Sequence, residues 1–370
     1  MKVKDITAAI EKIAPLKLAQ GWDNVGLLIG NPQQDVKNIL LTIDITGTVV
    51  TEAKRLKTDL IVSYHPVIWD GLKKITTEGA TGVVYELIRR GIAVFSIHTA
   101  LDSAIGGVND ALAEIVGIVD AKPIGDFVDS ALSDIYKIIV FIPISAVAKV
   151  SDAVFAAGAG KMGNYSHCGF QAQGTGTFLP LEGAKPAIGK KGKLEKVPEV
   201  RFETIVPAEK LDDCIAAMKK AHPYQIPAFD CIKLYNLQVK FGLGRIGKLS
   251  QPIRIEQIIR KIKRSTGAKA VGIIGDSKKL VKTAAVCAGS CGEIINSVIT
   301  AKIDLYVTGE IKHHQALAAS EANLACICLS HSVSERFILK KLAKQLQKQV
   351  PQVTIKVSKK DAEPFKWKNI

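Results

Sequence analysis

Histidines and acidic residues stand where several apolar stretches of this chain end. The run "LIVSYHPVIW" is typical of a buried strand and carries His65 at its end. Two further apolar runs lead into the pattern His-x-x-x-acid, once as His98 with Asp102 and once as His331 with Glu335. Imidazole nitrogens together with carboxylate oxygens suit Zn, Mn or Fe(II), and two such ions ~3.5 to 4 Å apart can activate water. The pattern predicts a site for one or two divalent metal ions per chain.

Each of these residues also has a purely structural alternative. His65 could be a strand-end histidine held by a backbone partner. Asp102 could cap the turn before "GGVNDALAEI", where a helix is expected to start. Ser332 and Glu335 have the spacing of a capping box, in which Glu335 would bond the Ser332 amide. Metal binding explains all of these residues at once, at matching places in a repeated pattern, so we favour it.

The elements that must position these residues form an internal repeat. Each copy reads strand, strand, helix, strand, and a further helix and strand follow it. The segments are "VGLLIG" (25–30), "ILLTIDIT" (39–46) and "VVTEAKRLKTDLIVSYHP" (49–66), against "VGIIGD" (271–276), "TAAVCAGS" (283–290) and "IINSVITAKIDLYVTGEI" (294–311). Apolar strands that alternate with helices indicate an α/β fold with a buried sheet. Ligands bind at the strand ends of such sheets.

A stretch of different character separates the two copies. It reads strand, helix, strand, strand, helix, strand, which is the ferredoxin-like order. Insertion of a complete unit is tolerated where the entry and exit points of the host lie close together. We therefore predict an outer domain in two parts, 1–128 and 240–370, and an inserted domain over 130–238. The segment "GLGRIG" (242–247) matches a dinucleotide-binding fingerprint, but "KLSQP" follows where a helix should begin, so we expect a return linker there.

Composition limits the class of protein. The chain has 370 residues, of which 47% are hydrophobic and 23% charged, as in a soluble globular protein. No apolar run approaches the ~18 residues that would suggest a membrane span. The stretch "MKVKDITAAIEKIAPL" contains acidic residues where a signal peptide requires an apolar core. We expect a cytoplasmic protein with no membrane partner.

Charge and cysteine content suggest partners and redox state. The formal charge of +15 reflects either a solvated lysine surface or attraction to an anion, such as a nucleotide or a nucleic acid. The seven cysteines are odd in number and lie mostly in apolar runs, which favours reduced, buried thiols over a disulfide framework.

The chain resembles the NIF3-like family, whose members are also called GTP cyclohydrolase 1 type 2 homologues. The matching segments are "WDNVGLLIG" (22–30), "SYHPVIWDGLKKI" (63–75), "HTALDSAIGGVNDALAE" (98–114), "DLYVTGEIKHH" (304–314) and "LSHSVSER" (329–336). The resemblance implies a duplicated α/β outer domain, split by an inserted ferredoxin-like domain of the PII/CutA type. It also implies a dinuclear metal centre inside a toroidal homohexamer, a trimer of dimers.

The resemblance also implies a set of site residues. The metal ligands of the family fall on His65, Asp102, His331 and Glu335, with His98 beside them. One position departs from the pattern, because many bacterial members have two adjacent histidines where this chain has Tyr64 and His65. One ion is then short of a ligand unless Tyr64 supplies its phenol, which requires deprotonation from a pKa near ~10. We expect zinc first, with Mn or Fe as alternatives.

The function expected from this site is hydrolysis of a nucleotide-like, anionic substrate. His98 and Glu310, which lies in the segment "TGEIKHH", are the expected proton carriers. The alternative is a protein without catalytic activity: a hexameric metal-binding scaffold, or a regulatory or nucleic-acid-binding protein.

Overall fold

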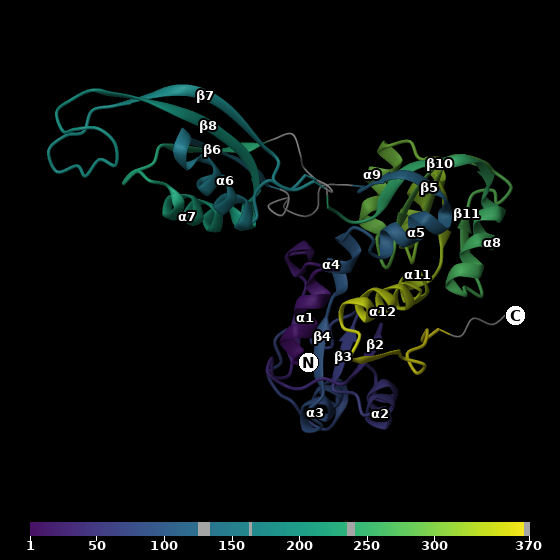
Figure 1. Ribbon diagram of the computed structural model, residues 1–370. Coiled ribbons are helices and arrows are strands. Elements are labelled where there is room, and N and C mark those ends of the chain that lie inside the picture. The colour runs from purple at the N-terminus through teal and green to yellow at the C-terminus, as the bar shows by residue number, and fades with distance from the viewer. Residues whose placement is uncertain (125–133, 163–164, 235–240, 366–370) are drawn as a thin grey trace, which may run out of the picture. The chain divides into compact units, whose positions relative to one another are not determined.

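The computed structural model describes residues 1–124, 134–162, 165–234 and 241–365. The chain divides into two compact units, one formed by Met1–Val128 with Phe241–Ile370 and the other by Asp129–Lys240 (Figure 1). The predicted domain limits at 128, 130, 238 and 240 fall outside the described residues, so these boundaries stay a prediction.

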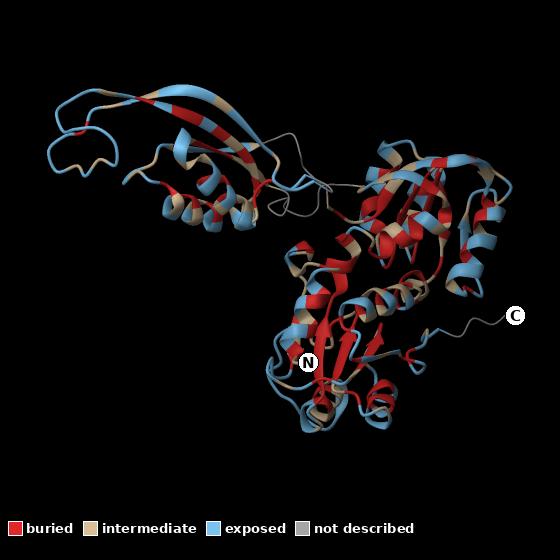
Figure 2. Cartoon of the chain, viewed as in Figure 1, coloured by how far each residue is buried: buried red, intermediate tan, exposed pale blue. Residues whose placement is uncertain are grey.

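The first sheet of the larger unit has the strand order β1-β4-β3-β2-β15. Its strands are β1 (Gly26–Ile29), β2 (Asn38–Thr42), β3 (Leu60–Ser63), β4 (Ala93–Ser96) and β15 (Thr354–Val357). β1 is antiparallel to β4, whereas the other neighbours are parallel. Every residue of β3 and β4 is buried, as Figure 2 shows in red, because helices cover the sheet.

Amphipathic helices supply that cover. They are α1 (Val3–Glu11), α2 (Gly47–Arg55), α3 (Gly82–Arg89) and α12 (Ile338–Gln349). Val49 and Ala53 of α2 and Leu87 of α3 share one core cluster with Leu40 and Ile61 of the sheet. α12 contacts α1, β2 and β15.

The second sheet repeats the first, with the order β11-β14-β13-β12-β10-β5. Its strands are β5 (Ile118–Lys122), β10 (Arg245–Arg254), β11 (Gly272–Ile274), β12 (Leu280–Cys287), β13 (Leu305–Thr308) and β14 (Ala325–Cys328). β11 is antiparallel to β14, as β1 is to β4, and β12, β13 and β14 are parallel. The helices of this half are α5 (Val108–Val116), α8 (Ile255–Thr266), α9 (Ile295–Thr300) and α10 (His313–Glu321).

Each sheet also contains a strand from the other part of the chain. β5 precedes the inserted unit in sequence but pairs with β10 in the second sheet. β15 comes last among the strands but pairs with β2 in the first sheet. The linker expected over 242–247 is wrong from Arg245 onward, because Gly247 lies within β10 and pairs with Ala284.

The smaller unit is built from β6 (Ile135–Pro143), α6 (Val147–Ala156), β7 (Gly169–Phe178), β8 (Glu195–Pro207), α7 (Leu211–Ala221) and β9 (Phe229–Leu234). Its antiparallel sheet has the order β7-β8-β6-β9, with β6 in the interior between β8 and β9. Val150 and Val154 of α6 and Met218 of α7 pack on Ile138 and Phe202 of this sheet. The unit therefore has a hydrophobic core of its own.

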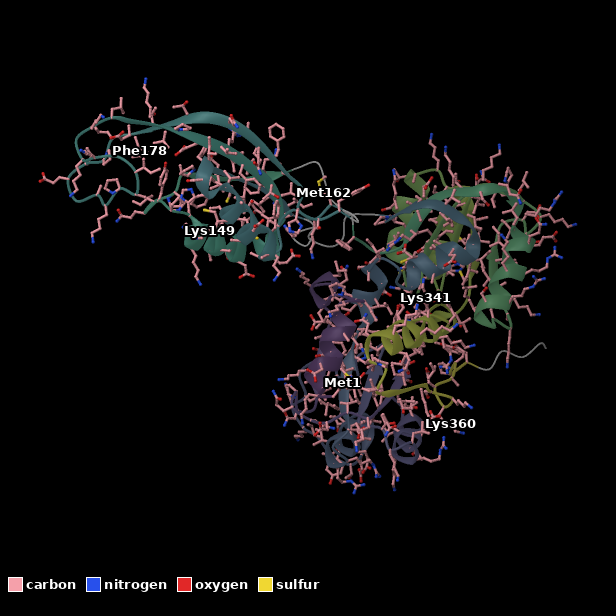
Figure 3. All side chains as sticks on the ribbon, viewed as in Figure 1. Met1, Lys149, Met162, Phe178, Lys341 and Lys360 are labelled. Atoms are coloured by element: carbon pink, nitrogen blue, oxygen red, sulfur yellow. The ribbon has the colours of Figure 1, made fainter. Side chains whose placement is uncertain are left out.

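Charged side chains occupy the surfaces of both units, as the nitrogen-tipped sticks of Figure 3 show. Among the described residues, the helices are too short or too polar to reach across a bilayer.

Candidate metal centre

The first sheet brings four of the predicted residues to one edge. Tyr64 and His65 directly follow β3, and their backbone amides donate to the carbonyls of the last residue of β2 and of the residue after it. His98 and Asp102 lie on α4 (His98–Ser103), which starts two residues after β4 ends. Because β3 and β4 are parallel neighbours, their carboxyl ends place these side chains close together. The ring centroids of His65 and His98 are 5.1 Å apart.

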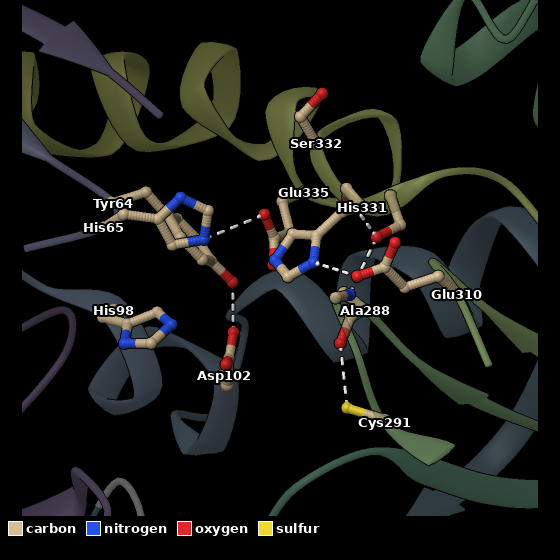
Figure 4. A network of polar contacts seen from close by, with 12 residues as sticks. Tyr64, His65, His98, Asp102, Ala288, Cys291, Glu310, His331, Ser332 and Glu335 are labelled. Atoms are coloured by element: carbon tan, nitrogen blue, oxygen red, sulfur yellow. Dashed lines mark hydrogen bonds and ion pairs between the residues drawn. The ribbon is translucent and has the colours of Figure 1, made fainter. Parts of the chain in front are cut away.

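The second sheet supplies the remaining residues at its equivalent edge. Glu310 follows β13, and His331 and Glu335 lie on α11 (His331–Arg336) after β14. Ligand atoms of His65, His331 and Glu335 lie within 4.8 Å of one another. Figure 4 shows these three side chains pointing toward one another from opposite sides of the site. Residues from the two halves of the chain therefore meet at one cluster.

Glu335 occupies the middle of this cluster. Its carboxylate has Oε1 3.3 Å from Nε2 of His331 and Oε2 3.4 Å from Nε2 of His65. Glu335 is 2% exposed, and Oε2 makes no hydrogen bond of ordinary geometry with any described residue. A Cβ on Gly289 would lie 2.7 Å from Glu335 Oε1, so only glycine leaves this space open. A buried carboxylate oxygen that lacks a hydrogen bond, between two imidazoles, fits a bound cation.

Each of the three histidines has a carboxylate within hydrogen-bond distance of its Nδ1 atom. Nδ1 of His65 lies 2.9 Å from Asp44, Nδ1 of His98 lies 2.9 Å from Asp23, and Nδ1 of His331 lies 3.0 Å from Glu310. Metal-binding histidines typically have this arrangement, because the carboxylate fixes the ring and leaves Nε2 with its lone pair free for the ion.

Fully buried Tyr64 and partly buried Asp102 form a pair beside the cluster. The Tyr64 hydroxyl donates a short hydrogen bond to Asp102 Oδ1. Burial and the nearby carboxylates of Asp102 and Glu335 raise the pKa of Tyr64 well above 10. Burial also raises the pKa of Asp102, to about 7, against the opposing effect of His98. The phenol is therefore protonated here, and it occupies an oxygen of Asp102 that a metal ion would need.

The other groups of the cluster carry opposite charges. Burial by itself lowers the pKa of His65, but the carboxylates of Asp44 and Glu335 beside its two ring nitrogens outweigh it and raise the pKa to about 10. The hydrogen bond to Glu335 raises the pKa of His331 to about 9, despite burial. Burial opposes ionisation of Glu335, but His331 and His65 lower its pKa to about 2. A divalent ion would take the place of these imidazole protons, so metal binding would release them.

The structural alternatives for two residues are wrong. α11 begins at His331, with Ser330 as its N-cap, so Ser332 does not cap it. The Ser332 hydroxyl instead donates to Glu363, and Glu335 faces the histidines. Asp102 does not cap α5, whose N-cap is Gly107.

A cavity of about 430 Å³ opens beside the cluster and is lined by two tryptophans. Trp22 is 67% exposed and Trp69 is 52% exposed, which is unusual for this residue type. Their rings lie 5.9 and 5.4 Å from the ring of His98, and Trp69 lies 6.1 Å from His65.

Sequence reasoning missed Trp22 and Trp69, and also Asp23 and Asp44. All four lie in or beside segments that drew attention for other reasons, namely "WDNVGLLIG", "SYHPVIW" and "ILLTIDIT". Trp22 and Asp23 precede β1 and Asp44 follows β2, and neither strand leads to a predicted site residue, so the sequence offered no specific signal for these three. Trp69 lies in the segment that also contains His65.

The fold and the site define a doubled α/β protein with a possible metal-binding triad where its halves meet. The family model described as Duf34/NIF3 (NGG1p interacting factor 3) matches residues 1–364, and the chain belongs to this family. A Mycobacterium tuberculosis relative named "GTP cyclohydrolase 1 type 2 homolog" is 38% identical over 340 residues, covering 90% of this chain and 88% of the relative. A Bacillus subtilis relative of the same name is 34% identical over 366 residues, covering 98% and 97%.

Solved structures agree with this assignment. The Bacillus cereus protein related to NIF3 superposes with a TM-score of 0.87 at 35% identity, with 99% of both chains covered. The Staphylococcus aureus protein SA1388 superposes with a TM-score of 0.80 at 27% identity, again with 99% of both chains covered. The predicted family and the predicted α/β fold are confirmed.

Proposed function

We propose that this protein is a metal-dependent hydrolase that acts on an anionic substrate with a nucleotide-like ring. The main support for the proposal is that the cluster of histidines and carboxylates lies beside a cavity that is lined by tryptophans. Two histidines held by carboxylates, His65 and His331, flank Glu335, and a third, His98, lies beside His65. Two exposed tryptophans line the same cavity. The names of the relatives, GTP cyclohydrolase 1 type 2 homolog, make GTP the first substrate to test.

His65, His331 and Glu335 would hold a first ion, and Asp102 with His98 would serve a second one. Nitrogen and carboxylate donors together favour zinc, with Mn or Fe(II) as alternatives. A bound ion would supply a Lewis acid that polarises the substrate and lowers the pKa of water. The Tyr64 hydroxyl must leave Asp102 before both oxygens of that carboxylate are available, so we propose that the second ion is held weakly.

His98 is the residue that we propose as proton carrier. It is 8% exposed, lines the cavity and has Asp23 at Nδ1, so its other nitrogen can accept a proton from water whenever that nitrogen does not hold the second ion. Glu310 contacts Nδ1 of His331 and is half exposed. Its first role is therefore to position His331, and proton transfer at the open side of the site is a second role that we propose for it.

Trp22 and Trp69 would recognise the ring of the substrate. Tryptophan faces stack on planar heterocycles, and each base–aromatic stack contributes ~1 to 3 kcal/mol. The cluster itself is rich in carboxylates, which repel an anion. An anionic substrate would therefore require bound cations at the site, which links substrate binding to metal binding.

The assembly implied by the resemblance, a homohexamer built as a trimer of dimers, is part of the proposal. Light scattering coupled to size-exclusion chromatography measures it directly, and a monomer at micromolar concentration would contradict it.

The experiment that tests the function is turnover of GTP and a panel of other nucleotides by zinc-loaded protein, followed by chromatography. We expect turnover that His331→Ala abolishes and that His313→Ala, at an exposed histidine outside the cluster, leaves intact. Trp22→Ala and Trp69→Ala should raise KM more than they lower kcat. Full metal loading with no turnover across the panel would favour the metal-binding scaffold instead.

A further inference from the structure

We propose that Cys287 and Cys291 are a redox-active pair that forms a reversible disulfide beside the metal centre. Their sulfur atoms lie 2.6 Å apart, and Cys291 also contacts the carbonyl of Ala288 at 3.0 Å. A disulfide bond measures ~2.05 Å, so closing the bond requires an approach of well under 1 Å. Both thiols are free in the structure.

The two thiols have different surroundings, which assigns them different roles. Cys291 is partly exposed and lines the cavity that also holds His65 and Glu335. Cys287 is fully buried at the end of β12, and burial raises the pKa of its thiol well above the ordinary value. Cys291 is therefore the thiol that an oxidant in the cavity reaches first, and Cys287 is the partner that closes the bond.

The reaction balances with a hydroperoxide as the oxidant. The Cys291 thiolate attacks one peroxide oxygen, the O–O bond breaks, and Cys291 becomes a sulfenic acid while the other oxygen leaves as hydroxide or alkoxide. The Cys287 sulfur then attacks the Cys291 sulfur, the S–O bond breaks, and the thiol proton leaves with the hydroxide as water. A small thiol would reverse the reaction by exchange.

The loop between the two cysteines is attached to the candidate metal centre from two sides. The Gly289 amide donates to Ser334 Oγ at 2.8 Å, and the Gly289 carbonyl accepts from the Glu310 amide at 3.1 Å. On the other side, the Ala288 amide donates to Asn109 Oδ1 at 2.9 Å, and Asn109 Nδ2 donates to the Asp102 carbonyl at 3.0 Å. Figure 4 shows Ala288 and Cys291 close to this centre.

Because Gly289 lies against Glu335, a shift of this loop changes the position of the central carboxylate. Loss of such supporting contacts typically weakens metal binding ~10- to 100-fold. The disulfide form should therefore bind metal more weakly than the dithiol form. This effect on metal rests on the proposed metal centre, whereas the formation of the disulfide does not.

Another close pair in the sequence offers a matched control. Cys326 and Cys328 lie two residues apart on β14, so their side chains share one face of the sheet, about 6.6 Å apart along the extended strand, which is too far for their sulfur atoms to bond without distorting the strand. Cys328 is partly exposed, as Cys291 is. Cys328→Ser thus removes a similar thiol without touching the proposed pair.

The test treats the metal-free full-length protein with hydrogen peroxide and maps its peptides by mass spectrometry. We expect a cross-link between Cys287 and Cys291, with loss of two hydrogens, that a small thiol reverses. Cys328→Ser should retain it and Cys291→Ser should lose it. Cys287→Ser should leave a sulfenic acid on Cys291 that dimedone traps. Failure of Cys291 to react, or a cross-link between other cysteines, would overturn the proposal. If a variant does not fold, peptide mapping of the oxidised wild-type protein alone shows whether Cys287 and Cys291 are cross-linked.

A second measurement tests the coupling to metal. Zinc affinity of the oxidised and reduced forms is compared by competition with a chelator. We expect the oxidised form to bind zinc about tenfold more weakly than the reduced form. Cys287→Ser, treated with peroxide and then reduced with a small thiol, should bind zinc as tightly as the same variant without treatment. Equal affinities in the two wild-type forms would refute the coupling, even if the disulfide forms as proposed.

Discussion

The carboxylate of Glu335 lies between His331 and His65, 3.3 and 3.4 Å from their Nε2 atoms, and so joins residues from opposite ends of the chain. No single half of the protein contains this arrangement. The candidate metal centre is therefore a property of the complete outer unit, and substitutions on either side should act on the same equilibrium.

The first prediction tests whether Asp102 and Glu335 serve one centre. Asp102→Asn and Glu335→Gln should each weaken zinc binding at least ~10-fold, because each removes negative charge from a partly buried cluster of histidines. The double variant should lose little more than the worse single variant, a strong departure from additivity. Calorimetric titration of zinc into all four proteins measures this. Additive losses of thermal stability with zinc binding retained would refute a shared centre.

The second prediction concerns Tyr64. Because its hydroxyl donates to Asp102, we expect one tight and one weak metal ion per chain after mild chelation and titration. Tyr64→His should strengthen the weak site, because imidazole adds a ligand and frees the carboxylate. Tyr224→Phe is a suitable control, since Tyr224 donates to Glu199 in the inserted unit, which contains none of the residues of the candidate centre. Two equally tight sites in the unmodified protein would contradict the prediction.

The third prediction concerns the inserted unit. Its helices pack on its own sheet and form a separate core, so the outer unit should not need it. Deletion of residues 130–238 with a short Gly/Ser bridge should leave a folded protein that binds zinc with the affinity of the full chain. Circular dichroism and metal titration measure the two properties. An unfolded or metal-free product would show that the predicted boundary or the split-domain interpretation is wrong.

The fourth prediction concerns Glu52, which attaches the segment after β15 to α2. Its buried carboxylate accepts a 2.6 Å hydrogen bond from the Ser358 hydroxyl and bonds from the amides of Lys359 and Lys360. Glu52→Ala should lower the free energy of unfolding by about 2 kcal/mol at neutral pH. Glu86→Ala is the control, because its partners Arg89 and Arg90 form only surface ion pairs on α3, and it should cost less.

The sign of the pH dependence follows from the pKa of Glu52. Burial opposes ionisation, but the hydrogen bonds from Ser358, Lys359 and Lys360 outweigh it and lower the pKa below 4.5. The carboxylate therefore stabilises the folded state fully above pH 4.5, and this stabilisation is lost as pH falls through the lowered pKa. Urea unfolding of the wild-type protein and of Glu52→Ala, measured between neutral and acidic pH, should show that the difference in their free energies of unfolding shrinks in acid. A constant difference would contradict the assignment.

The sequence predicted the parts of the fold and site that have a local pattern. His65, His98 and His331 follow apolar strands, and the repeat placed these strand ends in two similar halves. Asp23 and Asp44 were missed because a single acidic residue beside a strand has no local pattern of its own. Their role appears only when the fold brings them to the rings of His98 and His65.

Two other features could not be read from local patterns. β15 has only four residues and alternates exposed with half-buried positions, so its pairing with β2 is set by contacts distant in sequence. Ser332 and Glu335 have the spacing of a capping box, but the N-cap residue of α11 is Ser330. The Glu335 side chain contacts His331 and His65 instead of the backbone amide of Ser332. Tertiary contacts with buried charged groups outweighed the local preference.

The pairing of β15 with β2 has a consequence for synthesis on the ribosome. Chains emerge and begin to fold from the N-terminus, so β2 lies at an open edge of the first sheet until Thr354–Val357 leaves the exit tunnel. An open edge is a template for pairing with other chains. Nascent chains should therefore depend on chaperones until β15 arrives, and truncation before residue 354 should cause aggregation during translation in addition to a loss of stability.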